Sequence, residues 1–412
     1  MVTQNIVVVG TGEYGIQLLG PTLHILQQEG RVHVTATVDV KDRVETPHYA
    51  HVGHRLRQPE QDLSDLLSDL QETKPVVILG HSNEFHTPDA LDLIAHGYSV
   101  MVEKPFAVSL PQLQALNTGM QQHPHSVALV EYYLMMKAAP VLVASGSIDP
   151  LSFYHEKPGI IETRGALAGQ GWGNIHGKLE EMIGKPLAVY LDILEGEKKE
   201  RGTGRVDHRG SHLIDRRIGG GMLQDLGVHG LTILFALEKY LGAIDSHFSD
   251  GVVRVARAAE YSTFARDVHQ IPNDCIGESY AELDFSTASG VPVSLRVGKY
   301  VLDNRNQRRL VIVGDQGTLH HDLSTCQLSI VQGDTSRGVL LEAPKTAASK
   351  YYPVIRAGLE ILQGNTLYHG FDATTVALRS QELVLFALDK AYRSGDVRIY
   401  SSASTNPKAI FS

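Results

Sequence analysis

The sequence contains little that would suit a disulfide-bonded, membrane-spanning or nucleic-acid-binding protein. Only two of its 412 residues are cysteines, Cys275 and Cys326, too few for a disulfide framework or a zinc site built from cysteines alone. No run approaches the roughly 18 apolar residues that a membrane-spanning helix needs. The net charge of −9 disfavours nucleic acid as a partner, because phosphate binding needs a basic face.

The rest of the composition is typical of a globular protein long enough for two domains. The first residues, MVTQNIVVVG, lack the basic segment and cleavage site of a secretory signal, so we expect a cytoplasmic protein. The 20 histidines are scattered along the chain. Apart from the neighbours His320 and His321, none shows metal-ligand spacing, so we assign no metal.

A glycine-rich motif follows the first predicted strand, residues 5–9. The sequence GTGEYG places Gly10, Gly12 and Gly15 in the pattern G-x-G-x-x-G. Gly10 permits a tight turn, Gly12 lets the backbone approach a pyrophosphate, and Gly15 lets the next helix pack against the strand. The N-terminus of that helix offers free N–H groups to phosphates. The motif therefore predicts a dinucleotide-binding site.

Asp39 lies at the end of the second predicted strand, residues 32–38. Its carboxylate can accept hydrogen bonds from ribose hydroxyls and would repel a 2′-phosphate, which favours NAD over NADP. Two basic residues, Lys41 and Arg43, follow closely in the sequence, so NADP is an alternative cofactor.

Strands and helices continue to alternate through the first third of the chain. This alternation predicts a doubly wound parallel sheet. The further strands are expected at 75–79, 98–102 and 126–133, and the helices at 88–96 and 110–120.

The strand at 98–102 is followed by Glu103, Lys104 and Pro105. Ligands bind at the carboxyl edge of such sheets, so a lysine at this point can reach both the nicotinamide ribose and a substrate hydroxyl. The simpler alternative is a surface Glu-Lys pair before a turn.

The segment GGGMLQDLGVH opens a predicted helix, Met222–Tyr240, and carries Asp225 and His229 four residues apart. Residues with this spacing share one helical face, so the carboxylate can orient the imidazole while the histidine moves a proton. The simpler alternative is a core histidine and a solvated aspartate. The glycine motif and Lys104 in the same chain favour the catalytic interpretation.

From about residue 135 the pattern changes to closely spaced strands, several of which alternate apolar and polar residues. We therefore expect a Rossmann domain at 1–134 and a substrate-binding and oligomerisation domain of the α+β class at 135–412, with an open, mostly antiparallel sheet. The strands of this second domain are expected at 187–194, 251–257, 279–286, 291–300 and 309–314.

Four motifs, GTGEYG, Asp39, VEKP and GGGMLQDLGVH, occur in an order that resembles the glucose-fructose oxidoreductase/inositol dehydrogenase/MocA-type family of NAD(P)-dependent oxidoreductases. The late segments LVIVGDQGTLHHDL and VALRSQELVLFALDKAYRSGD are also similar to that family. The resemblance implies the same two domains, and a homodimer or homotetramer formed through the open sheet.

The resemblance also implies the site residues. The catalytic roles fall on Lys104, Asp225 and His229, and Glu103 lies near the nicotinamide ribose. The implied cofactor is NAD, with NADP possible. The implied cofactor-binding residues are Gly10, Thr11, Gly12, Glu13, Tyr14, Gly15, Asp39, Ser82, His86, Glu103 and Lys104.

The leading hypothesis is therefore hydride transfer between nicotinamide and a secondary alcohol or ketone of a sugar, cyclitol or related polyol. A redox-neutral, NAD-dependent glycosidase or lyase is an alternative that uses the same residues, and a non-catalytic NAD-binding regulator is another.

Departures from the family pattern put the substrate in doubt rather than the chemistry. Thr232 stands where the family often has an acid, and Lys137, not arginine, precedes Pro140. The segments Gly146–Gly177 and Glu195–Arg209 are interpreted as insertions.

Two further features have open interpretations. Trp172 can stack on a sugar or lie in the core. The segment 215–217, Asp-Arg-Arg, can line the substrate side of the cleft or form a solvated turn.

Overall fold

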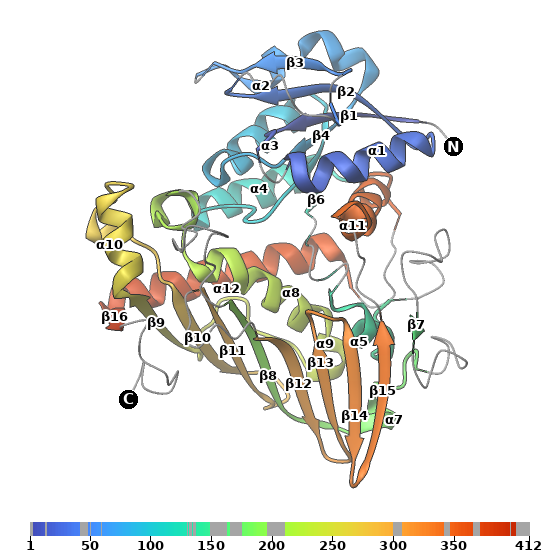
Figure 1. Cartoon of the computed structure of the whole chain (residues 1–412), viewed down its shortest axis with the longest axis vertical. Helices are drawn as coiled ribbons and strands as arrows, with labels where there is room; N and C mark the ends of the chain where they lie inside the picture. The colour runs from blue at the N-terminus through green and yellow to red at the C-terminus, as the bar shows by residue number, and fades with distance from the viewer. Residues whose placement is uncertain are drawn as a thin grey trace, which may run out of the picture.

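Two β-sheets and their helices make up the described part of the chain (Figure 1). The computed structural model describes residues 3–12, 15–41, 48–49, 51–58, 60–129, 131, 134, 137–148, 163–164, 175–195, 211–299, 307–341, 347–365, 371–395 and 397–400. Residues 135 and 136, at the predicted domain boundary, lie outside these ranges, so the division at residue 134 stays a prediction.

The first sheet has six strands, all parallel, in the order β3-β2-β1-β4-β5-β6. Its central strands are short apolar runs that are buried on both faces, as parallel strands between helices require. The predicted doubly wound sheet is confirmed. The strands are β1 (Gln4–Val9), β2 (Val32–Asp39), β3 (Gly53–Leu56), β4 (Val76–Leu79), β5 (Ser99–Val102) and β6 (Val127–Leu129).

Helices from two distant parts of the chain cover the first sheet. A π-helical turn, Gly15–Leu19, precedes the first of them. The helix α11 (Ala347–Leu362), which the sequence analysis did not predict, packs against α1 and also contacts β5 and β6 (Figure 1). The other helices are α1 (Gly20–Gln28), α2 (Leu63–Leu66), α3 (His86–Ala95) and α4 (Leu110–Gln122).

The second sheet has ten described strands in the order β16-β9-β10-β11-β8-β12-β13-β14-β15-β7. Only the pairs β16–β9 and β11–β8 are parallel, so the predicted mostly antiparallel sheet is confirmed. The strands are β7 (Thr163–Arg164), β8 (Pro186–Glu195), β9 (Val252–Ala258), β10 (Tyr280–Ser286), β11 (Pro292–Lys299), β12 (Gln307–Gly314), β13 (Thr318–Asp322), β14 (Gln327–Gln332), β15 (Thr335–Leu341) and β16 (Val397–Tyr400).

Two helices, α8 (Val228–Ala236) and α12 (Ala373–Ser394), lie between the sheets (Figure 1). A side chain at Gly230 would bring its Cβ within 2.8 Å of a methyl carbon of Leu295, so glycine lets α8 approach the second sheet closely. The remaining helices of this part are α5 (Ala139–Ala144), α7 (Leu179–Ile183), α9 (Glu238–Leu241) and α10 (Ala259–Asp267).

The predicted helix Met222–Tyr240 is divided into three parts. It begins with a π-helical turn, Leu223–Gly227, continues as α8 and ends as the short helix α9. A π-turn is frequent at functional sites, and this one carries Asp225.

The face of the second sheet away from α8 carries a row of alternating charges across neighbouring strands. In register, Arg254, Glu282, Arg296, Asp192 and Arg309 lie side by side. Asp192 is only 1% exposed, because the guanidinium groups of Arg296 and Arg309 approach its two oxygens within 2.6–2.8 Å. We call this side, with its charged row, the open face of the sheet.

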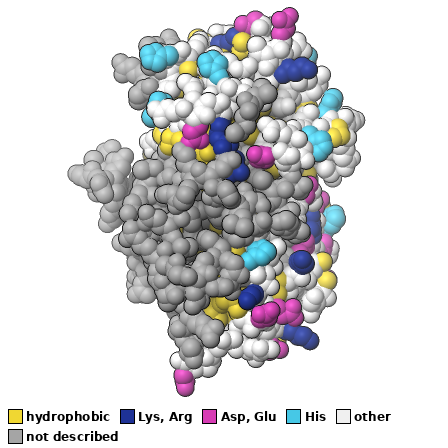
Figure 2. Space-filling model, turned by 90° about the vertical axis from the view of Figure 1, so that its right-hand side faces the viewer, with side chains coloured by type: hydrophobic (Ala, Val, Ile, Leu, Met, Phe, Trp, Pro, Cys, Tyr) yellow, Lys and Arg dark blue, Asp and Glu magenta, His cyan; other side chains and the backbone are white. Residues whose placement is uncertain are grey.

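Basic, acidic and histidine side chains are interspersed on the described part of one molecular face (Figure 2). Within the described ranges, no helix has both the length and the apolar character needed to cross a membrane.

Candidate active site

The glycine loop after β1 is shaped by close backbone contacts. Gly10 has φ +92°, and a Cβ there would lie 2.7 Å from the carbonyl oxygen of Gly80. A Cβ at Gly15 would lie 2.3 Å from the carbonyl oxygen of Gly10. A Cβ at Gly12, in contrast, would meet no atom within 4 Å. Packing therefore requires glycine at the first and third positions, while the second leaves room for a ligand to approach the backbone, as a pyrophosphate does.

Asp39 at the end of β2 is held against this loop. Its Oδ2 accepts hydrogen bonds from the backbone N–H and the hydroxyl of Thr11, at 2.8 and 2.7 Å, and its Oδ1 accepts one from the N–H of Lys41. These three bonds hold the carboxylate in a fixed position against the glycine loop. The predicted loop residues Glu13 and Tyr14 lie outside the described residues.

Ser82 and His86 follow β4 but have different surroundings. Ser82 is exposed, whereas the side chain of His86 is buried. The two ring nitrogens of His86 lie 2.9 Å from the carbonyl oxygen of Pro105 and 3.2 Å from that of His81. Burial, together with the nearby His81, lowers the pKa of His86 to about 4. His86 is therefore neutral at pH 7 and supports the loop that carries Lys104.

Lys104 forms an ion pair with Asp225, which lies 121 residues later in the sequence. The Lys104 Nζ lies 2.5 Å from Asp225 Oδ1 and 3.0 Å from the Asp225 main-chain oxygen. Burial acts to lower the pKa of Lys104, but the carboxylates of Asp225, Glu103 and Glu131 outweigh it and raise that pKa. Lys104 is therefore a cation at neutral pH.

A second lysine, Lys299 at the end of β11, donates a hydrogen bond to the other carboxylate oxygen of Asp225. Burial acts to raise the pKa of Asp225, but the charges of Lys104 and Lys299 dominate and hold it well below its usual range. Asp225 is therefore an ionised carboxylate between two ammonium groups.

His229 pairs with Glu131 rather than with Asp225. The Nδ1 atom of His229 forms a hydrogen bond with Glu131 Oε1, while the oxygens of Asp225 bond to the two lysines. Glu131 is 1% exposed, and its Oε2 accepts hydrogen bonds from the N–H of Leu134 and the hydroxyl of Thr232. The predicted orientation of the imidazole by Asp225 is thus corrected, because Glu131 after β6 occupies that position.

The triple glycine before the π-turn packs against a buried carboxylate. Glu278, which is 0% exposed, accepts hydrogen bonds from the N–H of Leu223 and the hydroxyl of Tyr392, at 2.7 and 2.8 Å. A Cβ at Gly221, where φ is +117°, would lie 2.7 Å from both Glu278 oxygens. Burial raises the pKa of Glu278. This contact fixes the start of the segment that carries Asp225.

The residues before the triple glycine pair with one another and with a neighbouring helix. Arg217 donates to both oxygens of Asp215, and the guanidinium of Arg216 lies 4.4 Å from the ring centre of Tyr392. Trp172 and most of the two predicted insertions lie outside the described residues.

No group of three or more His, Cys, Asp or Glu side chains among the described residues is arranged to hold a metal ion.

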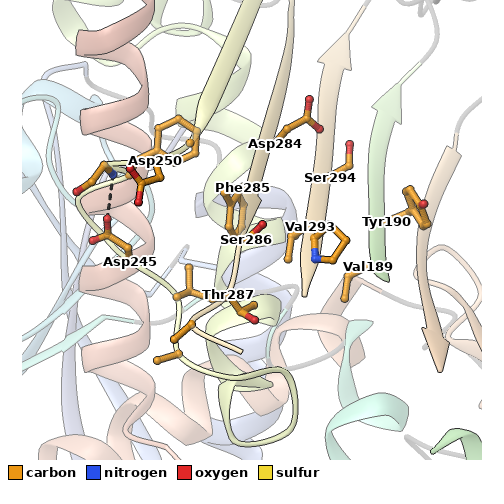
Figure 3. A pocket seen from close by; sticks show the side chains of 17 residues that line it. Val189, Tyr190, Asp245, Asp250, Asp284, Phe285, Ser286, Thr287, Val293 and Ser294 are labelled. Carbon is orange, nitrogen blue, oxygen red and sulfur yellow. Dashed lines mark hydrogen bonds between the residues drawn. The ribbon is translucent and has the colours of Figure 1, made fainter. Parts of the chain in front are cut away.

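A separate cavity of about 900 Å³ lies beside the opposite ends of β8 and β11 (Figure 3). Its lining includes Val189 and Val293, six residues before Glu195 and Lys299 on the same strands. Six residues of strand span about 20 Å. Because none of the predicted site residues lines this cavity, it is distinct from the candidate active site.

Three residues of the site were missed by the sequence analysis: Glu131, Lys299 and Glu278. Each is a single charged residue that follows a strand, ends one or precedes one, and none belongs to a motif. The available signal was their position at predicted strands: Glu131 and Lys299 lie near the carboxyl ends of the strands predicted at 126–133 and 291–300, and Glu278 directly precedes the one predicted at 279–286.

Comparison with known proteins finds a family model that matches the first part of the chain and solved structures that share the fold of nearly the whole chain. Residues 4–130 match the model of an oxidoreductase family with an NAD-binding Rossmann fold. A search of curated proteins found no match.

Solved structures cover nearly the whole chain. A 3-ketoreductase from Actinomadura kijaniata, KijD10, in complex with TDP-benzene and NADP, is 18% identical over 97% of this chain and 99% of its own, with a TM-score of 0.59. GenD2 from gentamicin A biosynthesis, in complex with NAD, is 18% identical over 96% and 95%, with a TM-score of 0.64. A levoglucosan dehydrogenase in complex with NADH and levoglucosan is 13% identical over 95% and 98%, with a TM-score of 0.66. At these identities the likeness shows the fold.

Replacing Gly221 with alanine should destabilise the protein more than replacing a glycine that has only an unusual φ. We expect Gly221→Ala to lower the free energy of unfolding by about 2–4 kcal/mol, because it adds a clash with Glu278 to the backbone strain. The matched control is Gly290→Ala, where φ is +79° and no atom lies within 4 Å, with an expected loss of about 1–2 kcal/mol. Urea unfolding measures both, and equal losses would contradict the proposed packing contact.

Proposed function

We propose that the chain, whose residues 4–130 match the model of an oxidoreductase family with an NAD-binding Rossmann fold, is an NAD(P)-dependent oxidoreductase of the Gfo/Idh/MocA family. In this proposal it transfers a hydride between nicotinamide and a secondary alcohol or ketone of a sugar, cyclitol or related polyol. The observation that carries the proposal is the Lys104–Asp225 ion pair, with Asp225 and the Glu131-bound His229 one helical turn apart. The ketoreductase and the levoglucosan dehydrogenase of similar fold support the substrate class.

The glycine loop suits a dinucleotide, and its geometry supports a preference for NAD. The space above Gly12 and the N-terminal end of the helix that follows fit a pyrophosphate. Asp39 is fixed beside Thr11, where its carboxylate lies next to the glycine loop and its charge opposes a 2′-phosphate.

When bound at the glycine loop, NAD⁺ would supply the acceptor for the hydride, with its two electrons, that leaves the carbinol carbon in the oxidation. His229 takes the hydroxyl proton, and a ketone remains. Glu131 bonds to Nδ1 of His229, which orients the ring and stabilises its cationic form. The Lys104 ammonium stabilises the alkoxide that develops on the substrate oxygen. The reduction runs the same steps in reverse.

Removing the side chain of Lys104 or of His229 should greatly reduce turnover while leaving cofactor affinity largely intact. We expect Lys104→Met and His229→Ala to lower kcat by about 100-fold or more, because each removes charge stabilisation or proton transfer in the transition state. The measurement is formation of reduced cofactor from NAD⁺ and NADP⁺ with a panel of sugars, cyclitols, sugar acids and sugar nucleotides, alongside calorimetric titration of the cofactor.

Full activity in either variant would contradict these roles. Substrate turnover without accumulation of NADH in the wild-type protein would instead favour a redox-neutral reaction at the same residues. Nucleotide binding with no turnover across the panel would contradict the enzymatic proposal.

Neutralising Asp39 should shift cofactor selectivity toward NADP. In Asp39→Asn the hydrogen bonds from Thr11 can persist while the repulsion of a 2′-phosphate is lost, so the ratio of NADP to NAD affinity should rise about tenfold or more. Calorimetric titration with each cofactor measures the ratio. Asp92→Asn, which changes an acid bonded to Ser64 on the outer helix α3, is the matched control and should leave it unchanged. An unchanged ratio in the Asp39 variant would overturn this role.

We also propose that a second copy of the chain covers the open face of the second sheet. The charges of its row are engaged in ion pairs, with Asp192 between Arg296 and Arg309 and with Arg254 bonded to acids of β10. The apolar or aromatic side chains of Tyr190, Val252 and Val331 are 36–50% exposed on the same side. Burying such surface against a copy of itself is favourable. Light scattering should find a dimer or tetramer for the wild-type protein and a smaller species for Tyr190→Lys. A monomeric wild-type protein would rule this out.

A further inference from the structure

We propose that Lys299 is a positioning residue of this site: it holds one oxygen of Asp225 so that the carboxylate keeps its other oxygen on Lys104. The inference rests on the proposed function for its catalytic consequence. The contact itself is independent of that function, because it joins residues of the chain alone.

Lys299 is placed by the central strands of the second sheet. It is the last residue of β11, which runs parallel to β8 and pairs Lys299 with Glu195 in register. The alternation along β11 puts Lys299 on the same side as the buried Leu295 and Val297, which is the side that α8 covers. Its Nζ donates to Asp225 and lies 3.9 Å from Glu195 Oε2. The strand pair therefore fixes the ammonium before any ligand binds.

The charges around Asp225 come from both sheets. Among the described residues around it, acidic groups exceed basic ones, so a single lysine would leave Asp225 among other carboxylates. The acids are Asp225, Glu103, Glu131 and Glu195, and the bases are Lys104, Lys299 and Arg308, with His229 bonded to Glu131 and Arg308 bonded to Glu195.

In the proposed reaction the ammonium group of Lys104 must bind both Asp225 and the substrate oxygen. Lys299 shares the binding of Asp225. The three N–H groups of Lys104 serve the Asp225 carboxylate, the Asp225 main-chain oxygen and, in the proposed reaction, the substrate oxygen. As the Lys104 charge turns toward a developing alkoxide, its hold on Asp225 weakens. Lys299 then keeps Asp225 ionised and in place, so that Lys104 stays aligned.

The two lysines depress the pKa of Asp225, so its ionised form is lost only as the pH falls through that low value. Removing Lys299 raises the pKa of Asp225, so the titration of its carboxyl group should move to higher pH by about 1–3 pH units. At neutral pH, kcat should fall more than KM rises, because the alignment of Lys104 matters most in the transition state.

The experiment compares Lys299→Met and Lys299→Gln with Lys299→Arg, which restores the cation. The matched control is Lys390→Met. The ammonium group of Lys390 likewise donates hydrogen bonds, in its case to the backbone oxygens of Ser249 and Gly251, but it lies outside the site. The pH dependence of kcat and KM is measured for each variant. In parallel, the carboxyl ¹³C signal of Asp225, assigned with Asp225→Asn, is followed through an acid titration.

We expect both neutral variants to move the Asp225 titration upward, and Lys299→Arg and Lys390→Met to leave it near the wild-type value. An unchanged titration in a folded neutral variant would overturn the inference, as would equal losses of activity in Lys299→Arg and Lys299→Met. Both neutral variants could fail to fold while Lys299→Arg folds. If Asp225 in Lys299→Arg then titrates like an isolated aspartate, the inference is overturned as well. The carboxyl titration needs no substrate. A wild-type protein that is inactive across the panel would refute the proposed function, whereas the titration would still test whether Lys299 holds Asp225.

Discussion

The ion pair between Lys104 and Asp225 joins the two halves of the site. The lysine follows a strand of the first sheet, and the aspartate lies on the π-turn that leads into α8, against the second sheet. Taking either charge out of water alone would be costly, and removing one partner would leave the other uncompensated. This ion pair therefore depends on the two sheets being held at one fixed separation.

Several buried groups maintain that separation. Glu278 accepts a hydrogen bond from the start of the π-turn, and Gly230 lets α8 approach the strands beneath it. On the other side, His86 supports the loop that carries the lysine. These groups have a structural role. Each fixes a backbone segment, and that segment positions a charged side chain of the site. Their burial explains why the charged cluster can be ordered before any ligand is bound.

The sequence predicted every strand of the first sheet except β3, because the predicted strands are short, largely buried apolar runs. The edge strand β3 was missed because it is a short, largely polar and incompletely buried segment. The glycine motif, Asp39 and Lys104 could be found because each directly follows or ends one of the apolar runs. The spacing of Asp225 and His229 correctly placed both residues on one segment. It did not reveal their partners, because a helical face says nothing about which distant side chains meet it.

What the sequence by itself determined is the order of strands and helices, the dinucleotide loop and the residue types available for chemistry. These follow from local periodicity and from the backbone freedom of glycine. Only the tertiary structure decided that Glu131 meets His229 and that Lys299 meets Asp225. Those pairs join residues far apart along the chain, and their match depends on how two separate sheets pack, which no local pattern records.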